Sequence, residues 1–394
     1  MAKRREVDPG LQYLQKIGFN RIRGPHGLAD RWITLYGKKK ANELFDRFDA
    51  RVVGSKEFYE FKNSSLSLSS SISEAYDGDI IRKACNYISA HKEFFGHTIL
   101  EVGCESGYMT GFLAITFPES QIVSIDRSES AIEIAKQRIA QLNVSNVSFR
   151  CCGPDAIDEE FDTVFCMRTI QENYDHEAAP FIGEPFTYQC FKYADLTSAY
   201  TDSLMKCLKD TGTFCVFERL GYDPLMCGWM LSLNAWSCSI NKDSYENIVC
   251  EEANERSTFQ AFVAAPGAHS SEADVIRFWY ETIEIDFTGL TTLTSWQALI
   301  YLNDNAGELI KGIYVYDADD VVVGRFAIFY DCDSKETIYY LMSTNGETNL
   351  FSASSEQLED FLKHMESAIA ANNRGGNHCR DINTDTDPVE RSIK

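Results

Sequence analysis

Segments with the character of strands and of helices alternate along residues 76–266. Short apolar runs of strand length lie at 98–101, 121–126, 147–151, 161–167 and 212–218. Between them lie segments with the apolar spacing of helices, such as Ser130–Leu142 and Ala194–Lys209. This alternation predicts a parallel sheet with helices on both faces. We therefore expect an α/β fold of the doubly wound type, which ends in an antiparallel pair at Asn247–Glu251 and Thr258–Ala264.

The most informative local feature follows the first of these runs. The strand ends in an acid, Glu101, and a turn with glycines at 103 and 107 leads to a helix predicted at Met109–Phe117. Glycine lets the backbone approach a ligand without a Cβ in the way. The first turn of a helix offers unpaired N–H groups and a partial positive charge. These features indicate a turn that binds a cofactor.

A dinucleotide-binding turn would require the pattern G-x-G-x-x-G. Glu105 stands where the second glycine of that pattern belongs, and Tyr108 stands where the third belongs. A carboxylate facing a pyrophosphate would be repelled, whereas an acid beside a cationic sulfonium is tolerated. The comparison favours S-adenosylmethionine over a nicotinamide dinucleotide.

The segment resembles motif I of the class I S-adenosylmethionine-dependent methyltransferases, in which an acid is followed by alternating glycines. Glu101, Gly103 and Gly107 match that motif, and Glu105 departs from its commonest form. Asp126 ends the next predicted strand, at a spacing that suits a carboxylate accepting both ribose hydroxyls. The resemblance covers residues 76–266 and implies a Rossmann-like sheet of seven strands with S-adenosylmethionine as the cofactor.

The resemblance also implies cofactor contacts at the ends of the first three strands. Asp155 stands where an acid of the family hydrogen-bonds the adenine amino group, and the backbone of the next residue contacts a ring nitrogen. For Asp162, a structural role at a strand edge and a functional role stay equally open. The expected cofactor-binding residues are Glu101, Gly103, Cys104, Gly107, Asp126, Arg127, Asp155 and Ala156.

Catalytic residues are harder to assign, because positioning the two reactants can supply roughly 7–11 kcal/mol of barrier reduction without a general base. If a base acts, we expect it in the segment 168–185, after the fourth strand, where His176, Glu172 and Tyr174 are the candidates. An exposed polar loop is the other interpretation of this segment. The signature Asn-Pro-Pro-Tyr of amino-methyltransferases is absent after that strand, which argues against N-methylation of nucleobases or glutamine of that type.

The remaining regions resemble no family that we recognise. Residues 1–75 are predicted to be helical, with the serine-rich stretch Asn63–Ser73 as a loop or linker. Residues 267–371 are predicted to form an α+β accessory domain, and the polar residues 372–394 a disordered tail. The expected accessory elements are a helix at Glu272–Ile283, antiparallel strands at Ile313–Tyr316, Val321–Tyr330 and Thr337–Met342, and a closing helix at about 355–371.

Two further regions keep more than one interpretation. The aromatic-rich stretch 170–193 and the apolar stretch 225–240 either cover a small organic substrate or pack against other parts of the protein. The accessory domain either binds substrate, forms a homodimer or meets a carrier protein.

Charge and cysteine content exclude several classes of protein. The net charge is −22, from 59 acidic and 37 basic side chains, so a phosphate backbone would be repelled and we expect no nucleic acid partner. The 13 cysteines lie mostly in apolar runs, and no CxxC pair has a matching partner, so we expect no metal site and a reduced, cytoplasmic compartment. No signal peptide is apparent, and no apolar run approaches the ~20 residues that span a membrane.

We therefore expect an S-adenosylmethionine-dependent methyltransferase that methylates an oxygen or nitrogen atom of a small or medium-sized organic molecule. A protein or peptide side chain is an alternative acceptor. Glu105 and the large accessory domain also leave open a catalytically inactive binding or regulatory protein with the same fold.

Overall fold

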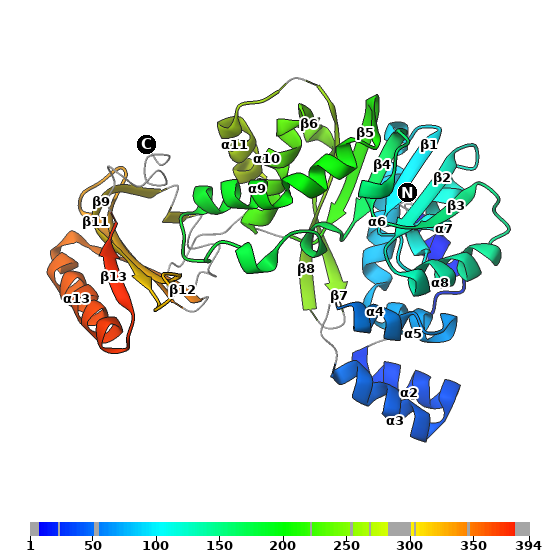
Figure 1. Cartoon of the computed structure of the whole chain (residues 1–394), viewed down its shortest axis with the longest axis horizontal. Coiled ribbons are helices and arrows are strands. Elements are labelled where there is room, and N and C mark those ends of the chain that lie inside the picture. Colours follow the sequence, from blue (N-terminus) through cyan, green and yellow to red (C-terminus); the bar gives the residue numbers. More distant parts are fainter. Residues whose placement is uncertain are drawn as a thin grey trace, which may run out of the picture. The chain divides into compact units, whose positions relative to one another are not determined.

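The computed structural model describes most of the chain (Figure 1). The described residues are 8–22, 24–50, 55–220, 223–252, 255–267, 269–282, 301–302, 305–344 and 347–382. They divide into two compact units, the first within Met1–Tyr174, Ala199–Gly221 and Leu233–Ser270, and the second within Asp175–Ser198, Tyr222–Ser232 and Ser271–Lys394.

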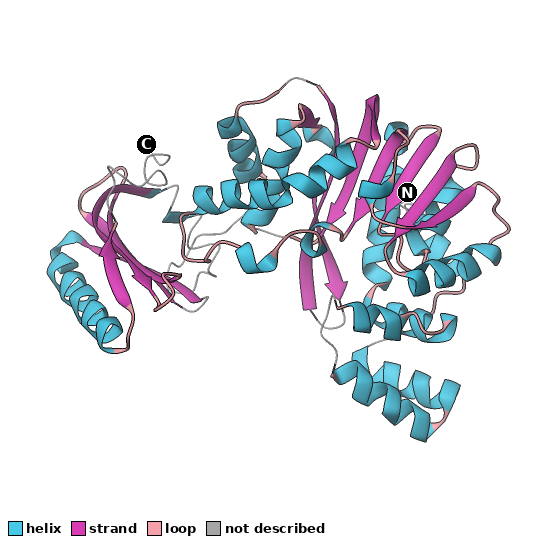
Figure 2. Cartoon of the chain, in the orientation of Figure 1, coloured by secondary structure: helices cyan, strands magenta, loops and turns pink. Residues whose placement is uncertain are grey.

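An eight-stranded sheet organises the first unit (Figure 2). Its strands are β1 (Thr98–Val102), β2 (Gln121–Asp126), β3 (Val147–Cys151), β4 (Phe161–Met167), β5 (Leu208–Glu218), β6 (Cys238–Ile240), β7 (Glu246–Glu252) and β8 (Glu255–Pro266). Seven of them follow the order β3-β2-β1-β4-β5-β8-β6, and β7 pairs with β8. Strands β1 to β5 are parallel, and β8 pairs antiparallel with β5, β6 and β7. The predicted doubly wound sheet is confirmed.

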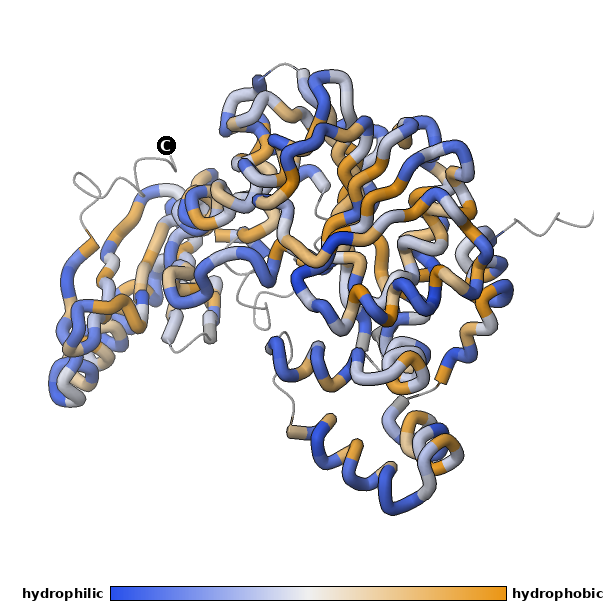
Figure 3. Tube along the Cα trace, turned by 45° about the vertical axis from the view of Figure 1, so that its right-hand side comes forward, coloured by the Kyte–Doolittle hydropathy of each residue, from blue (hydrophilic) through white to orange (hydrophobic). Residues whose placement is uncertain are grey.

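Helices cover both faces of this sheet. The helices between its strands are α7 (Tyr108–Thr116), α8 (Glu129–Ala140), α9 (Phe186–Met205) and α10 (Pro224–Ala235), and α6 (Gly78–Ala90) precedes β1. Helices α6 and α7 share a hydrophobic core with Ile99 and Phe165 of the sheet. Tyr200 of α9 lies near Cys166, which alternates with Phe165 and so points to the opposite face. Hydrophobic residues are accordingly concentrated along the central strands (Figure 3).

Two sequence predictions in this region need correction. The helix predicted at Ala194–Lys209 is α9, which begins earlier, at Phe186, and ends at Met205, because Leu208 and Lys209 already belong to β5. The apolar stretch 225–240 contains most of α10 and all of β6, neither of which was predicted as a separate element.

Five helices lie among the described residues up to 76, and one of them includes much of the stretch predicted as a linker. They are α1 (Pro9–Lys16), α2 (Gly24–Tyr36), α3 (Lys38–Asp49), α4 (Lys56–Lys62) and α5 (Leu66–Tyr76). Helix α5 overturns the predicted loop or linker at Asn63–Ser73. Ser65 caps it by accepting from the N–H of Leu68, and Leu68 and Ile72 are buried one turn apart. A serine is tolerated in this interior because Ser71 accepts a hydrogen bond from Trp32 Nε1 at 2.7 Å.

A five-stranded antiparallel sheet forms part of the second unit, in the order β12-β11-β10-β9-β13. The elements are α11 (Glu272–Glu281), β9 (Ala306–Tyr316), β10 (Val322–Asp331), β11 (Thr337–Thr344), β12 (Glu347–Ser354), α13 (Leu358–Arg374) and β13 (His378–Asp381). Met365 of α13 packs with Ile313, Phe326 and Tyr340 of the sheet. The predicted meander with its closing helix is confirmed, and Ile283 lies outside the described residues.

Strand β13 corrects the prediction that residues 372–394 form a disordered tail. It pairs antiparallel with β9, His378 stacks on Tyr316, and the Arg380 guanidinium carbon lies 4.5 Å from the centroid of that ring. A strand of four residues is too short to show a periodic pattern, so the polar composition dominated the prediction. Residues 383–394 lie outside the described part of the chain.

Among the described residues, no helix combines the length and the apolar character that crossing a membrane requires.

Candidate functional site

The loop after β1 is anchored to the neighbouring strand β2. The backbone N–H groups of Gly103 and Cys104 both donate to the carbonyl oxygen of Ile125, at 2.9 and 3.0 Å. The chain then turns through Gly107 into α7. Because β1 and β2 are parallel, this anchoring brings the two carboxyl ends together at one edge of the sheet.

Two glycines of this loop cannot be replaced without strain. Gly103 and Gly107 have φ angles of +76° and +79°, in the left-handed region that disfavours a side chain. A Cβ on Gly103 would lie 2.7 Å from Thr169 Cγ2, and one on Gly107 would lie 2.9 Å from the Cα of Ala135. The loop therefore requires glycine at the two positions that match the motif.

Asp126, at the end of β2, closes the loop. Its Oδ2 accepts a hydrogen bond from the backbone N–H of Glu105 at 2.9 Å, and its Oδ1 accepts from that of Ser128 at 2.8 Å. Ser128 caps α8 by accepting from the N–H of Ala131, so Asp126 is not the cap. Burial raises the pKa of Asp126. Each carboxylate oxygen has capacity for a second hydrogen bond.

Glu101 lies inside the protein and not at the surface of the edge. Its side chain is buried, and Oε2 accepts from the hydroxyls of Thr110 and Ser124, both at 2.6 Å. Burial raises the pKa of Glu101 to about 7. Cys104 is also buried. Contact of either side chain with a cofactor stays a prediction.

The residues predicted to hold the adenine ring lie together at the end of β3. Asp155 and Ala156 belong to the short 3-10 helix Pro154–Ala156, and both are exposed. The Arg127 guanidinium, which follows β2, lies 3.7 Å from Asp155 Oδ1. A Cβ on Gly153 would lie 2.3 Å from that oxygen, so the lack of a side chain at 153 lets the pair approach the backbone.

Glu218 ends β5 and was not predicted as a site residue. Its carboxylate is buried and accepts from the N–H of Thr169 at 2.7 Å and from its hydroxyl at 3.2 Å. Burial raises the pKa of Glu218 to about 7. The available signal was its position, because Glu218, like Asp126, is an acid that ends a predicted strand.

The three predicted catalytic candidates do not gather in one unit. Glu172 ends the 3-10 helix Ile170–Glu172 and accepts a hydrogen bond of 2.5 Å from the hydroxyl of Tyr59, on α4. Tyr174 is in the same unit, whereas His176 belongs to the second unit. Tyr59 is therefore a further residue of this region that the sequence did not indicate.

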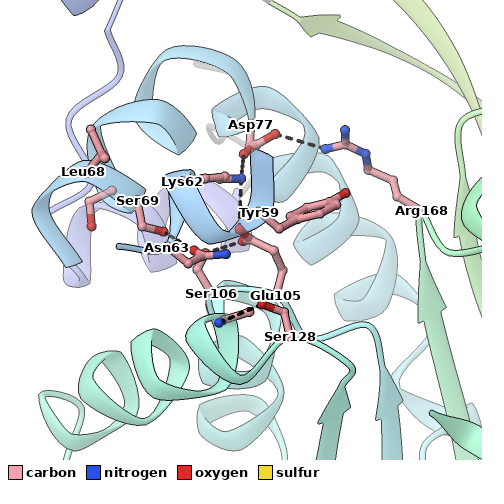
Figure 4. Close-up of polar contacts among 12 residues, drawn as sticks. Tyr59, Lys62, Asn63, Leu68, Ser69, Asp77, Glu105, Ser106, Ser128 and Arg168 are labelled. Atoms are coloured by element: carbon pink, nitrogen blue, oxygen red, sulfur yellow. Dashed lines mark hydrogen bonds and ion pairs between the residues drawn. The ribbon is translucent and has the colours of Figure 1, made fainter. Parts of the chain in front are cut away.

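Four charged residues from separate segments form a network beside the β1 loop (Figure 4). Lys62 Nζ, at the end of α4, lies 3.3 Å from Asp77 Oδ2 and 3.1 Å from Glu105 Oε1. Arg168 Nη1, after β4, lies 3.0 Å from Asp77 Oδ1. Lys62 and its neighbours hold the pKa values of Asp77 and Glu105 below their usual range despite burial. No local sequence pattern identifies Lys62 or Asp77.

Asp162 has a structural role at the opposite edge of the sheet. It lies near the start of β4, and its carboxylate accepts from the N–H and hydroxyl of Thr98, each at 2.9 Å, and from Lys209 at 2.7 Å. The hydrogen bond from Lys209 helps to lower the pKa of Asp162 to about 2. This geometry favours the structural alternative for Asp162.

Comparisons with known proteins agree with this geometry. A family model described as a methyltransferase domain matches residues 94–251. The chain is 36% identical over 96 residues to a malonyl-[acyl-carrier protein] O-methyltransferase of Bacillus cereus, and the match covers 23% of this chain and 35% of that protein. It is 28% identical over 97 residues to a ubiquinone biosynthesis O-methyltransferase of Neisseria meningitidis, which covers 24% of this chain and 40% of that protein.

These matches have a limited extent. The chain spans well under half the length of these two relatives. A crystal structure of the N-methyltransferase NodS from Bradyrhizobium japonicum, in complex with S-adenosyl-L-homocysteine, is 18% identical and covers 48% of this chain and 88% of that chain, with a TM-score of 0.34. That score is too low to add to the family match.

Proposed function

Through residues 94–251 the chain belongs to the class I S-adenosylmethionine-dependent methyltransferases, and from this premise we propose that it transfers a methyl group to an oxygen or nitrogen atom of a small or medium-sized organic molecule. The observation that carries the proposal is the hydrogen bond from the backbone N–H of Glu105 to Asp126 Oδ2. It joins the glycine loop to the acid at the end of β2, as a site for an adenosyl ligand requires.

The residues present fit S-adenosylmethionine. In the proposed site, Gly103 and Gly107 allow the left-handed backbone turns that bring the loop beside the methionine portion. The Asp126 carboxylate accepts the ribose hydroxyls with its remaining lone pairs, and Asp155 and Ala156 meet the adenine ring. When bound, S-adenosylmethionine supplies a methyl group that its sulfonium already activates.

Charge at the loop supports a cationic ligand. Asp77, Glu105, Asp126 and Glu172 lie in one electrostatically coupled cluster, against the cations Lys62 and Arg168. The cluster therefore carries more negative than positive charge. Attraction to a sulfonium is favoured there, because opposite charges a few ångströms apart interact strongly where water is partly excluded.

The acceptor is proposed from the names of the relatives and from the segment that follows β4. Both relatives are O-methyltransferases by name, so oxygen acceptors are the first to test. Orienting the acceptor against the methyl group can supply most of the rate enhancement. Glu172 is the proposed base where a hydroxyl must lose its proton, because it is a carboxylate in the segment that follows β4.

Isothermal titration of the full chain with S-adenosylmethionine and S-adenosylhomocysteine tests the cofactor. We expect binding by the wild type, and a loss of about 100-fold in affinity in Asp126→Ala, which removes a charged hydrogen-bond acceptor for two hydroxyls. Glu129→Ala is the matched control, because Glu129 is an exposed acid on the first turn of α8. An intact wild type that binds neither molecule would contradict the proposal.

Mass spectrometry of small molecules that co-purify with the protein, followed by methyl-transfer assays on them, tests the acceptor. Cofactor binding without transfer to any of these molecules or to a panel of hydroxylated and amino metabolites would favour the alternative of a binding or regulatory protein. Sedimentation analysis of the full chain tests whether it forms a homodimer, one of the three roles left open for residues 267–371.

A further inference from the structure

Glu105 is an unusual residue for its backbone conformation. Its φ angle is +45°, in the left-handed region where a side chain is strained and glycine is favoured. It lies between Gly103 and Gly107 in the loop that is proposed to hold the cofactor. An interaction of its side chain must therefore offset the strain that a glycine would avoid.

The Glu105 carboxylate is held by Lys62, from the end of α4. Lys62 Nζ lies 3.1 Å from Glu105 Oε1, and the Lys62 side chain is 10% exposed. Ser106 also donates its hydroxyl to Glu105. A buried ammonium needs counter-charges, and Lys62 has two, Glu105 and Asp77.

The same residue, Glu105, leads from Lys62 to the proposed ribose ligand. Its side chain meets Lys62, and its backbone N–H donates to Asp126 Oδ2 at 2.9 Å. A movement of Glu105 therefore changes the position of a hydrogen bond that orients the Asp126 carboxylate. Helix α4 thereby contacts the cofactor loop through the ion pair of Lys62 and Glu105 (Figure 4).

We propose that Lys62 is a positioning residue of the cofactor site, which fixes the loop at Glu105 by its ion pair and so orients the carboxylate of Asp126. The inference rests on the proposed cofactor binding. It gives a function to the glutamate at position 105, where the motif commonly has glycine. The carboxylate of Glu105 is held by a lysine of the amino-terminal helices. Without Lys62, no cation separates the buried carboxylates of Glu105 and Asp77. We therefore expect the Glu105 carboxylate to move into water and to displace the loop.

Isothermal titration with S-adenosylhomocysteine on the full chain tests this assignment. We expect Lys62→Met to weaken binding about tenfold, and the double variant Lys62→Met with Glu105→Gly to return to within about threefold of the wild type. The double variant removes the stranded carboxylate and supplies the residue that the backbone conformation favours. Lys56→Met is the matched control, because Lys56 lies on the same helix with its side chain 84% exposed.

Different outcomes separate the possible failures. Wild-type affinity in Lys62→Met, or no recovery in the double variant, would overturn the role of Lys62. If Lys62→Met does not fold, Glu105→Ala and Glu105→Gly replace it. The alanine variant is expected to bind about tenfold more weakly and the glycine variant about as well as the wild type, and equal affinities would overturn the inference.

A failure of cofactor binding in the wild type would contradict the proposed function, and the link itself is then tested without ligand. Hydrogen exchange of the backbone amides of residues 103–108 is expected to be about tenfold faster in Lys62→Met than in the wild type or in Lys56→Met. Unchanged exchange would overturn the link between Lys62 and the loop.

Discussion

The carboxylate of Glu218 holds Thr169 through two hydrogen bonds, of 2.7 Å from its backbone N–H and 3.2 Å from its hydroxyl. The Thr169 methyl group, Cγ2, in turn lies 2.7 Å from the position that a Cβ on Gly103 would take. The end of β5 therefore fixes the segment after β4 against the loop after β1. This contact brings the acceptor side and the cofactor side of the proposed site together within one unit.

Glu218 should make the stability of the protein depend on pH. Burial raises its pKa from the ordinary 4.5 to about 7, so the folded state holds a proton that the unfolded state releases between these values. Stability is therefore highest below about pH 4.5 as far as this group is concerned, and it falls by about 3 kcal/mol as pH rises to about 7.

Urea unfolding of Glu218→Gln between pH 5 and 8 measures this contribution. Buried Glu101, whose pKa is also raised to about 7, adds a similar dependence on pH. We therefore expect the variant to lose about half of the wild-type slope of the free energy of unfolding against pH. Glu129→Gln, which changes an exposed acid, should keep the full slope. An unchanged slope in Glu218→Gln would mean that Glu218 stays ionised in the folded protein.

Gly103→Ala should destabilise the protein for two separable reasons. The left-handed φ angle costs about 1–2 kcal/mol for a side chain, and the contact with Thr169 Cγ2 adds about 1–3 kcal/mol. Gly18→Ala is the control, because Gly18 has a φ angle of +70° and no atom within 4 Å of the added Cβ.

The steric part can be removed by a second substitution. Thr169→Ser lacks the methyl group and keeps the hydroxyl that donates to Glu218, so Gly103→Ala with Thr169→Ser should unfold at a urea concentration close to that of Gly18→Ala. If the second substitution recovers no stability, the loop has moved away from Thr169 and the described contact does not limit residue 103.

The parallel strands could be predicted because each is a short apolar run between helical segments. β3 and β4 were predicted to the residue, at Val147–Cys151 and Phe161–Met167. Helix α5 was missed because its serines are typical of loops, and only packing shows that Ser71 is satisfied by Trp32. The cap at Ser65 was the available signal.

The site could be predicted only where its residues lie at strand ends. Gly103 and Asp126 follow from the pattern, because the carboxyl ends of neighbouring parallel strands meet at one edge. Lys62 and Tyr59 could not be predicted, because a helix far along the chain brings them to the loop and nothing near them in the sequence records the contact.

Substitution of Lys209 should distinguish an acid with a structural role, Asp162, from an acid of the proposed cofactor site, Asp126. Lys209→Met removes a hydrogen bond of 2.7 Å at the amino-terminal edge of the sheet, and since both side chains are partly exposed we expect a loss of at most about 1 kcal/mol in the free energy of unfolding. The pKa of Asp162, lowered to about 2, should rise in the variant, so that stability is lost at a higher pH on acidification.

Cofactor affinity gives the contrast with Asp126. Lys209→Met should bind S-adenosylhomocysteine as the wild type does, because Asp162 and Lys209 lie at the edge opposite the glycine loop. A tenfold loss of affinity measured by titration would instead link that edge to the proposed site.

Tyr59→Phe should affect methyl transfer and leave cofactor binding nearly unchanged. The Tyr59 hydroxyl donates to Glu172 Oε1 at 2.5 Å, and both residues are in the first unit. Loss of this bond frees the Glu172 carboxylate to adopt other rotamers, so we expect kcat for a hydroxyl acceptor to fall about tenfold while the affinity for S-adenosylhomocysteine stays within about twofold.

A double-mutant cycle with Glu172→Gln identifies the cause. If Tyr59 acts through Glu172, Tyr59→Phe should lower kcat no further in a Glu172→Gln background, because the group that it positions is already absent. Tyr36→Phe is the matched control, because the Tyr36 hydroxyl pairs with Ser67 among the amino-terminal helices. If Tyr59→Phe lowers kcat as much in the Glu172→Gln background as in the wild type, Tyr59 orients the acceptor directly and does not act through Glu172.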